Sequence, residues 1–410
     1  RKLRIAFYSH DTMGLGHIRR NLLLARTLAE SPLQPNILLI TGTNVATSFA
    51  MPPGVDVLAL PGLGKDVDGR YKSRSLHLTL REIVSIREKT ICAALETFCP
   101  DVLIVDNVPR GTNCELDLAL EFLRSRGQTR FVLGLRDILD EPAAVQREWK
   151  RRQNEKIILD YYNAVWIYGD RKVFDPIREY QFSKALEEKM RFTGYLDRRL
   201  PRPPEKPAGS SKPKRASDPF ILCMAGGGQD GAVLLEAFAK ASLPNNACGV
   251  VLTGSYLPYA TRKMLHTQAG INPKLKILDF HPEPTQLLRD AQAVVAMGGY
   301  NTVSEILSFK KQALIVPRVV PRREQMIRAE RLKELGLLDI CHPDKVTPRA
   351  ITEWVRHTQA QPIPQRGPID LNGLNRIPSL VEEVVARGCQ FGKISRNSYD
   401  YENLRAPLAS

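Results

Sequence analysis

The sequence predicts an α/β protein built from two Rossmann-like, doubly wound domains that face each other across a cleft. Short apolar runs alternate with longer amphipathic stretches in the first half of the chain. A segment rich in proline and basic residues then interrupts the pattern near residue 200, and the alternation starts again after it. Repeated strand–helix alternation is typical of parallel sheets covered by helices, and 410 residues are enough for two or three domains.

The apolar runs of the first half are mostly continuous, as expected for strands buried on both faces of a parallel sheet. The predicted strands are Leu3–Ser9, Ile37–Ile40, Val55–Leu60, Val102–Asp106, Phe131–Leu135 and Ala164–Tyr168. The predicted helices between them include Ile18–Ala29, Arg81–Phe98 and Cys114–Arg126. Together these elements predict an N-terminal Rossmann-like domain over residues 1–199.

Residues 200–219 contain six prolines, several lysines and arginines and almost no apolar side chain, so they cannot form a core. We interpret them as an interdomain linker. The predicted strands after it are Phe220–Met224, Gly249–Thr253, Lys276–Asp279, Ala293–Ala296 and Ala313–Val316, and the predicted helices are Gly231–Lys240, Thr302–Phe309 and Ile377–Ala386. They predict a second Rossmann-like domain over 220–376, followed by a C-terminal helix and tail over 377–410.

Composition limits the function classes. The net charge of +15 favours a phosphorylated ligand, an anionic membrane surface or nucleic acid, but no nucleic-acid-binding module accompanies it. No run of about 18 apolar residues predicts a transmembrane helix. The seven cysteines are irregularly spaced and form no CxxC pair, which indicates neither a disulfide framework nor a zinc site. We expect a cytoplasmic protein, with peripheral contact at the inner face of the membrane left open.

Three glycine-rich loops each follow a predicted strand and precede a predicted helix: DTMGLGHIRR (Asp11–Arg20), AGGGQDGA (Ala225–Ala232) and MGGYNTVSE (Met297–Glu305). A helix N-terminus binds anions, and glycine lets the backbone approach a phosphate closely. A plain tight turn is the alternative for the first two loops.

In the third loop, Asn301 or Thr302 could cap the helix, and Thr302 with Glu305 fits a capping box. The functional interpretation instead assigns Thr302 to a phosphate and Glu305 to a ribose diol, because one carboxylate can accept hydrogen bonds from both diol hydroxyls.

These loops, in this order, resemble the GT-B fold and in particular the family 28 glycosyltransferases. This group includes the bacterial enzyme that adds N-acetylglucosamine to a lipid-linked muramoyl-peptide, and the plant galactolipid synthases. The resemblance extends over about Leu3–Leu338 and is strongest where MGGYNTVSE is followed by VPRVVPRREQMIRAERLKELG. The segments GLGHIRR, LGLRDILDEP and REQMIRAERL also resemble an uncharacterised bacterial branch of predicted glycosyltransferases.

The resemblance implies that Thr302 contacts the donor phosphate and that Glu305 holds the ribose. Glu324-Gln325 stands where the family has a glutamine pair on the donor sugar, so the donor sugar stays open. His281, after Phe280, stands where the family contacts the base. The donor-binding residues predicted in this way are Gly14, Gly16, Gly226, Gly227, Gly228, Gln229, His281, Gly298, Gly299, Asn301, Thr302, Glu305, Glu324 and Gln325.

The predicted reaction is an inverting transfer of a hexose or N-acetylhexosamine from a nucleoside-diphosphate sugar, with uridine as the expected base, to an unknown hydroxyl. His17 is the preferred general base because its reference pKa of about 6.5 leaves it mostly neutral at pH 7. Asp106 and Asp137 are the rival bases.

No cofactor or metal is expected, because helix N-termini and backbone amides neutralise the leaving diphosphate in GT-B enzymes. The DVD sequence at residues 66–68 is interpreted as a solvated loop. Two basic groups could meet anions: Arg19 and Arg20 an anionic acceptor, and Arg318, Arg322 and Arg323 the diphosphate. A solvated helix face is the alternative for each.

Two other function classes stay open at this point. One is a nucleotide-sugar 2-epimerase or hydrolase, for which Asp106, Asp137 and Glu324 could supply clustered carboxylates. The other is a non-catalytic nucleotide-sugar or nucleic-acid-binding protein. The acceptor is either a small molecule or lipid-linked.

Overall fold

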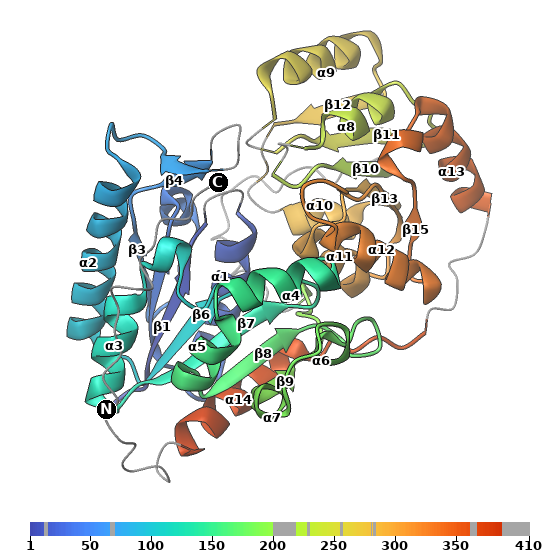
Figure 1. Ribbon diagram of the computed structural model, residues 1–410. Helices are drawn as coiled ribbons and strands as arrows, with labels where there is room; N and C mark the ends of the chain where they lie inside the picture. The colour runs from blue at the N-terminus through green and yellow to red at the C-terminus, as the bar shows by residue number, and fades with distance from the viewer. Residues whose placement is uncertain are drawn as a thin grey trace.

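Two parallel β-sheets form the framework of the molecule (Figure 1). The computed structural model describes residues 1–11, 15–65, 70–199, 219–227, 230–254, 257–279, 281, 284–360 and 367–387. The first sheet has seven strands in the order β3-β2-β1-β6-β7-β8-β9, and the second has six in the order β12-β11-β10-β13-β14-β15. Neighbouring strands in both sheets are parallel, which confirms the predicted α/β class.

The strands of the first sheet are β1 (Arg4–Ser9), β2 (Asn36–Thr41), β3 (Val55–Ala59), β6 (Val102–Asp106), β7 (Arg130–Arg136), β8 (Ala164–Tyr168) and β9 (Met190–Phe192). Those of the second are β10 (Phe220–Met224), β11 (Cys248–Leu252), β12 (Leu275–Leu278), β13 (Ala293–Ala296), β14 (Gln312–Ile315) and β15 (Asp339–Ile340). A separate antiparallel hairpin joins β4 (Leu63–Lys65) to β5 (Tyr71–Ser73).

The helices of the first domain are α1 (Gly16–Glu30), α2 (Leu80–Phe98), α3 (Asp117–Arg126), α4 (Pro142–Arg151), α5 (Asn154–Tyr161), α6 (Pro176–Glu179) and α7 (Lys184–Lys189). Those after it are α8 (Ala232–Ala239), α9 (Tyr259–Ile271), α10 (Pro284–Asp290), α11 (Tyr300–Ser308), α12 (Glu324–Glu334), α13 (Pro348–Ala360) and α14 (Gly373–Arg387). Short 3-10 turns lie at Asn44–Ser48, Thr112–Cys114 and Pro343–Lys345.

The central strands are buried along almost their whole length. In β6, β8, β10 and β13 every residue is buried, because helices cover both faces of the sheet. All eleven strands predicted from apolar runs are present, with ends shifted by at most one residue. Continuous apolar runs were therefore a sufficient signal for these strands.

One apolar core cluster extends through both domains. It contains Ile5 and Phe7 of β1, residues of α1 and α14, and also Leu222 of β10 and Val303 of α11. A second cluster fills the opposite face of the first sheet, under α2 and α3, and a third lies between the second sheet and α8, α9 and α13. The shared cluster shows that the two domains are packed against each other in this structure.

The C-terminal helix α14 packs on the first domain rather than the second (Figure 1). Tyr195 donates its backbone N–H to the carbonyl of Asp370, and Leu196 forms a β-bridge with Asn372 just before α14 begins. The chain therefore returns to its first half at its end, which the sequence did not predict. Residues 200–218 of the predicted linker and residues 388–410 of the predicted tail lie outside the described residues.

Each sheet has a topological switch point, where the chain leaves neighbouring strands in opposite directions. The switch points lie between β1 and β6 in the first sheet and between β10 and β13 in the second. Ligands of open α/β sheets bind outside the carboxyl ends of the strands at such points. All three glycine-rich loops follow β1, β10 or β13, so the topology places each of them at a switch point.

Two further expectations concern cysteines and membrane spans. The six cysteines in the described part of the chain are free: Cys92, Cys99, Cys114, Cys223, Cys248 and Cys341. Within the described residues, no helix is both long enough and apolar enough to span a bilayer. The stretch Leu76–Ile91, whose basic and apolar spacing is also typical of a membrane-surface helix, leads into α2, which buries Ile83, Ile91 and Leu95 beneath it.

Candidate active site at the two switch points

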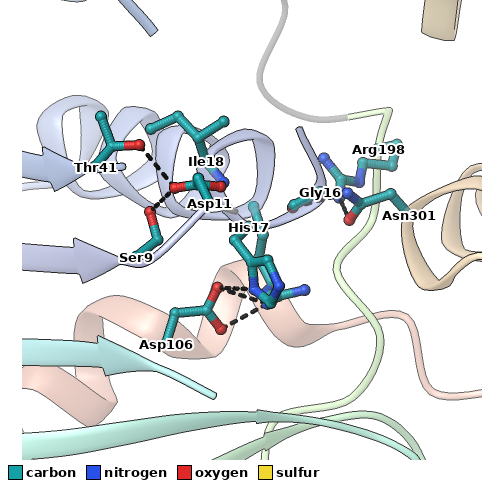
Figure 2. Close-up of polar contacts among 10 residues, drawn as sticks. Ser9, Asp11, Gly16, His17, Ile18, Thr41, Asp106, Arg198 and Asn301 are labelled. Carbon is teal, nitrogen blue, oxygen red and sulfur yellow. Dashed lines mark hydrogen bonds and ion pairs between the residues drawn. The ribbon is translucent and has the colours of Figure 1, made fainter. Parts of the chain in front are cut away.

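Asp11 shapes the loop between β1 and α1. Its backbone has a φ of 41°, and its buried carboxylate accepts hydrogen bonds from the side chains of Ser9 and Thr41 and from the backbone N–H of Ile18, 3.0 Å away (Figure 2). Ile18 lies in the first turn of α1, where a negative charge is stabilising. The α1 N-terminus is therefore held by the protein's own carboxylate, and the sharp turn fixes where the next residues of the helix lie.

His17 is the second residue of α1 and faces Asp106, the last residue of β6 (Figure 2). The imidazole Nδ1 lies 2.8 Å from Asp106 Oδ2. Arg20, one helical turn later, donates to both oxygens of the same carboxylate, at 2.6 and 2.7 Å. The side chain of His17 keeps 16% of its surface exposed, whereas Asp106 keeps 1%. The ring is therefore the accessible member of this cluster.

The charge of Asp106 fixes the tautomer of His17. Burial alone would raise the pKa of Asp106, but the charges of Arg20 and His17 outweigh burial and hold that pKa well below its usual range. An ionised Asp106 accepts a hydrogen bond from protonated Nδ1, which leaves Nε2 of the neutral ring as a proton acceptor. Arg20 Nη2 also lies 3.2 Å from Nδ1, but both atoms then carry hydrogens, so the carboxylate between them is their common partner.

The two rival bases do not agree with the geometry. Asp106 is held ionised by Arg20 and has the wrong pKa to take a proton near pH 7. Asp137 is also 1% exposed, and its oxygens accept from Arg328 at 2.6 and 2.8 Å and from the Tyr195 hydroxyl at 2.8 Å. These carboxylates are parts of buried ion pairs, so neither is available to an incoming hydroxyl group.

The third glycine loop meets the first across the domain boundary. Asn301 of α11 donates from Nδ2 to the carbonyl oxygen of Gly16 at 2.9 Å and accepts from Arg198 Nη2 at 2.5 Å (Figure 2). A Cβ on Gly16 would lie 3.4 Å from this Asn301 amide, so glycine suits the close approach. The two predicted ligand loops are therefore adjacent, although they are separated by more than half of the chain.

The capping alternative for the third loop is wrong. Helix α11 starts at Tyr300, its N-cap is Gly299, and no side chain caps it. Asn301 and Thr302 both lie inside the helix, and Thr302 is 9% exposed. The helix starts earlier than expected because Gly298 and Gly299 complete the turn after β13, which leaves the first-turn amides without a side-chain acceptor.

Glu305 is buried beside the cleft with one oxygen still unpartnered. Its Oε1 accepts from Arg19 Nη2 at 3.2 Å and from the Thr285 hydroxyl at 3.0 Å. Its Oε2 is buried and has no hydrogen-bond partner among the residues that the structure describes. A buried carboxyl oxygen in this state needs a hydrogen-bond partner, and hydroxyl groups of a ligand would supply one.

The second glycine loop lies at the end of β10. Gly226 has a φ of 63°, and both Gly226 and Gly227 are exposed. Gly254, after β11, packs against them so closely that a Cβ would lie 2.4 Å from the Gly226 carbonyl oxygen. Gly14, Gly228 and Gln229 lie outside the described residues, and His281 lies between β12 and α10.

Glu324 and Gln325 start α12 and are both buried. Arg318 joins them: its Nη2 donates to Glu324 Oε1 at 2.6 Å, and its backbone N–H donates to Gln325 Oε1 at 3.1 Å. Within the described part of the chain, the second oxygen of Glu324 is buried without a partner, as is that of Glu305.

The predicted basic residues divide into two groups. Arg322 and Arg323 contact the first domain, where Asp140 Oδ1 accepts the backbone N–H of Arg323 at 2.8 Å and Glu148 accepts from Arg322 at 3.4 Å. These contacts hold the start of α12 against the first domain, and neither arginine is positioned by a glycine loop. Arg19 and Arg318 instead contact predicted donor-site carboxylates.

Sequence reasoning missed two arginines in the cleft. Arg136 ends β7, and burial lowers its pKa to about 10, against the opposing effect of Glu324. Burial likewise lowers the pKa of Arg198 to about 10, against the opposing effect of Glu305. Arg136 had a readable signal, because it follows a buried strand just as Asp106 does; Arg198 had none. In the described part of the chain, no group of three or more His, Cys, Asp or Glu side chains could hold a metal ion.

The fold agrees with that of solved nucleotide-sugar enzymes. A calicheamicin glycosyltransferase matches with a TM-score of 0.55 and 18% identity over 94% of this chain and 99% of its own. MurG from Acinetobacter baumannii matches with a TM-score of 0.52 and 13% identity, covering 95% and 100%. A UDP-N-acetylglucosamine 2-epimerase matches with a TM-score of 0.59 and 13% identity, covering 98% and 100%. A search of curated proteins by sequence found no match.

Residues 221–366 match the family model described as the glycosyltransferase family 28 C-terminal domain. This match covers less than half of the chain. The matched residues include most of β10, the strands β11 to β15, the second and third glycine loops, and α12 with Glu324 and Gln325. Together with the structural matches, this match shows that the protein has the GT-B fold of two Rossmann-like domains, as the resemblance implied.

Proposed function

We propose that this protein is an inverting glycosyltransferase that moves a hexose or N-acetylhexosamine from a nucleoside-diphosphate sugar to a hydroxyl group. One observation carries the proposal. His17, oriented by Asp106, lies at the switch point of the first domain, and its neighbour Gly16 contacts Asn301 at the start of α11 in the family 28 domain. The proposed general base is therefore next to a helix start of the kind that binds anions, which supports the proposal.

In the proposed step, Nε2 of His17 takes the proton of the acceptor hydroxyl while that oxygen attacks the anomeric carbon. The bond from this carbon to the diphosphate oxygen breaks, and the nucleoside diphosphate leaves with the electron pair. A single displacement inverts the anomeric centre. Positioned bases of this kind contribute about 10²–10⁴-fold to a rate.

The family 28 domain is proposed to hold the donor. Backbone N–H groups of the loops at Gly226–Gly227 and Gly298–Gly299, with the start of α11 near Thr302, face the diphosphate. Glu305 is proposed to accept the ribose hydroxyls with Oε2, the oxygen that has no protein partner. Glu324 and Gln325 would then contact the transferred sugar. Uridine as the base follows from the resemblance and is part of the proposal.

No metal or cofactor takes part in the proposed mechanism. Helix N-termini and backbone amides supply positive potential to the leaving diphosphate, and Arg318 lies beside Asp230 and Glu324 at this end of the site. Contact with an anionic membrane, which the charge of +15 favours, stays a prediction, as does a lipid-linked acceptor.

A 2-epimerase or hydrolase is the second candidate, because an epimerase shares the fold. Such a reaction needs carboxylates at the sugar. Of those considered, Asp106, Asp137 and Glu324 each have an arginine partner at 2.6 Å, namely Arg20, Arg328 and Arg318. Release of nucleoside diphosphate that depends on an added acceptor supports the transferase, and release or epimerisation without any acceptor supports the second candidate.

Calorimetric titration with a panel of nucleoside diphosphates tests the donor site directly. We expect binding to the wild type, with Glu305→Ala weakening it by about 1.5–3 kcal/mol, as for a hydrogen bond to a charged group. Glu330→Ala, which removes an exposed carboxylate of α12, is the matched control, and thermal unfolding monitors the fold of each variant. Absence of binding to every nucleotide would overturn the proposal.

A further inference from the structure

Arg136 occupies a position from which it can reach a substrate. It is the last residue of β7, beside the Asp106 end of β6 and paired in register with Tyr168 of β8. The charged groups that act on it come from both domains: Glu324, Arg20, Arg328 and Asp106. The residue keeps partial exposure, although its Nε is buried. Its side chain therefore extends from the carboxyl edge of the first sheet, near charged groups of both domains.

Each carboxylate near Arg136 has a different arginine as its ion-pair partner, although Oε2 of Glu324 stays without one among the described residues. Arg20 holds Asp106, Arg328 holds Asp137, and Arg318 holds Glu324, each at 2.6 Å. Among the described residues, the side chain of Arg136 makes no hydrogen bond or ion pair, and its buried Nε has no partner. The charges of Glu324 and Asp106 act on this guanidinium, but neither carboxylate forms an ion pair with it. Burial opposes this charge and lowers the pKa of Arg136 to about 10.

A desolvated guanidinium without a partner is unfavourable, and its planar fork of N–H groups matches a carboxylate or phosphate. An unpaired arginine adds little to the stability of a fold. A ligand oxyanion would remove the unfavourable state, so the arrangement is typical of a binding site.

This position differs from that proposed for the donor diphosphate. Another arginine with a buried, unpartnered Nε, Arg198, lies beside Asn301 of α11, and the charged groups that act on it most are Glu305 and Arg19. Arg136 is influenced instead by Glu324, which stands at the proposed sugar-contacting position. The two arginines therefore lie near different predicted donor-site carboxylates, and Arg136 lies near Glu324, the proposed contact of the transferred sugar.

We propose that Arg136 binds an oxyanion, a carboxylate or phosphate, carried by a substrate at the sugar end of the cleft. The oxyanion belongs either to the transferred sugar or to the acceptor. The proposal rests on the proposed glycosyltransferase function for the naming of these two sources. It deepens that function by requiring a charged substrate.

The deciding experiment uses inorganic phosphate as the probe on the full chain, with the donor site saturated by uridine diphosphate and ionic strength held constant with chloride. We expect phosphate to bind the wild type in calorimetry and to raise its thermal midpoint. Arg136→Gln should weaken this binding about 10–100-fold, as for a lost charge-assisted hydrogen bond. Arg136→Lys should give an intermediate affinity, since it keeps the charge but not the fork. Arg151→Gln, on exposed helix surface, is the matched control.

Two further arms identify the source of the oxyanion. The donor arm compares UDP-glucuronate with UDP-glucose, and the acceptor arm compares glucose 6-phosphate with glucose in the presence of uridine diphosphate. A preference for the charged member in either arm, lost in Arg136→Gln, supports the proposal and names the source. Equal phosphate binding by wild type and Arg136→Gln, or no Arg136-dependent preference in either arm, overturns it.

The two proposals can fail separately. If uridine diphosphate does not bind, the glycosyltransferase proposal fails, while phosphate titration of the nucleotide-free protein still compares wild type with Arg136→Gln. Because the Arg136 side chain makes no hydrogen bond or ion pair with the described residues, we expect the thermal midpoint of Arg136→Gln without ligand to equal or exceed that of the wild type. We therefore expect Arg136→Gln to fold, so that each comparison of its ligand binding with that of the wild type can be interpreted.

Discussion

His17 and Asp106 are separated by 89 residues in the sequence, yet Nδ1 of the imidazole lies 2.8 Å from Oδ2 of the carboxylate. His17 lies in the first turn of α1, the helix that follows β1. Asp106 is the last residue of β6, the strand beside β1. The pair exists because parallel strands bring their carboxyl ends to one edge at the switch point. The proposed chemistry depends on this relationship.

Asp106→Asn should lower the transfer rate by about 10²–10⁴-fold while leaving donor binding within a few-fold of the wild type. An amide carries no charge to keep the proton on Nδ1 of His17, so Nε2 loses its role as acceptor. The measurement is the acceptor-dependent release of nucleoside diphosphate, with calorimetry for donor binding. His17→Ala should show a loss of similar size, and an unchanged rate in either variant would contradict the role of the pair.

Gly298→Ala and Gly299→Ala should separate stability from donor binding. A Cβ on Gly298 would lie 3.2 Å from the Cβ and the carbonyl oxygen of Gln325, and also from a methyl group of Ile315. We expect Gly298→Ala to cost about 1–3 kcal/mol of unfolding free energy, as for an overpacked core.

A Cβ on Gly299 meets no atom within 4 Å. Gly299→Ala should therefore keep the stability of the wild type but weaken nucleoside diphosphate binding, because the new methyl group stands where the backbone is proposed to approach the phosphate. Denaturant unfolding and calorimetry check both variants. Equal losses of stability in the two variants would contradict the expected difference in free space around Gly298 and Gly299.

The buried pair Arg328–Asp137 should contribute strongly to the packing of the two domains. Both side chains are 1% exposed, and Arg328 also donates to the carbonyl oxygen of Gly298 at 3.0 Å. Arg328→Met leaves Asp137 buried without its cation and should cost about 3–5 kcal/mol in denaturant unfolding. The double variant Arg328→Met/Asp137→Leu should recover most of this loss, since no unpaired charge is then buried. A double variant no more stable than the single one would show that the charge is not the cause.

His10 should make the protein less stable on mild acidification. Burial, and then the neighbouring His17 ring 4.6 Å away, lower the pKa of His10 well below its ordinary value, while Asp106 opposes this and Arg136 and Arg87 add to it. Below about pH 6.5 the unfolded chain binds a proton at this histidine that the folded protein does not.

The His10 contribution is therefore fully present above pH 6.5 and is lost as the pH falls, by up to about 1.4 kcal/mol per unit. Thermal unfolding between pH 7.5 and 5.5 measures it, and His10→Asn should flatten the slope in this range. The pKa of Asp106 is lowered in the folded protein, so its contribution to stability is lost only below about pH 4. That contribution therefore stays constant between pH 7.5 and 5.5. An unchanged slope in His10→Asn would locate the acid sensitivity elsewhere.

The local pattern of the sequence was enough to predict most of the fold. Continuous apolar runs located the central strands, and the three glycine loops marked the ends of β1, β10 and β13. The short strands β9 and β15 and the hairpin β4–β5 were missed because two or three residues carry no periodicity that can be read. The domain boundaries proposed from the proline-rich segment stay predictions.

The sequence by itself determined which residues stand after each strand, including His17, Asp106, Asp137 and Glu305. Only the tertiary structure decided which of them are paired and which remain accessible. Asp106 and Asp137 both follow apolar runs in the sequence, and in the folded protein each forms an ion pair with an arginine. The side chain of Arg136, in contrast, has no carboxylate partner among the described residues. The reason is physical: strand formation follows from neighbouring residues, whereas the state of a buried charge depends on partners brought close from distant parts of the chain.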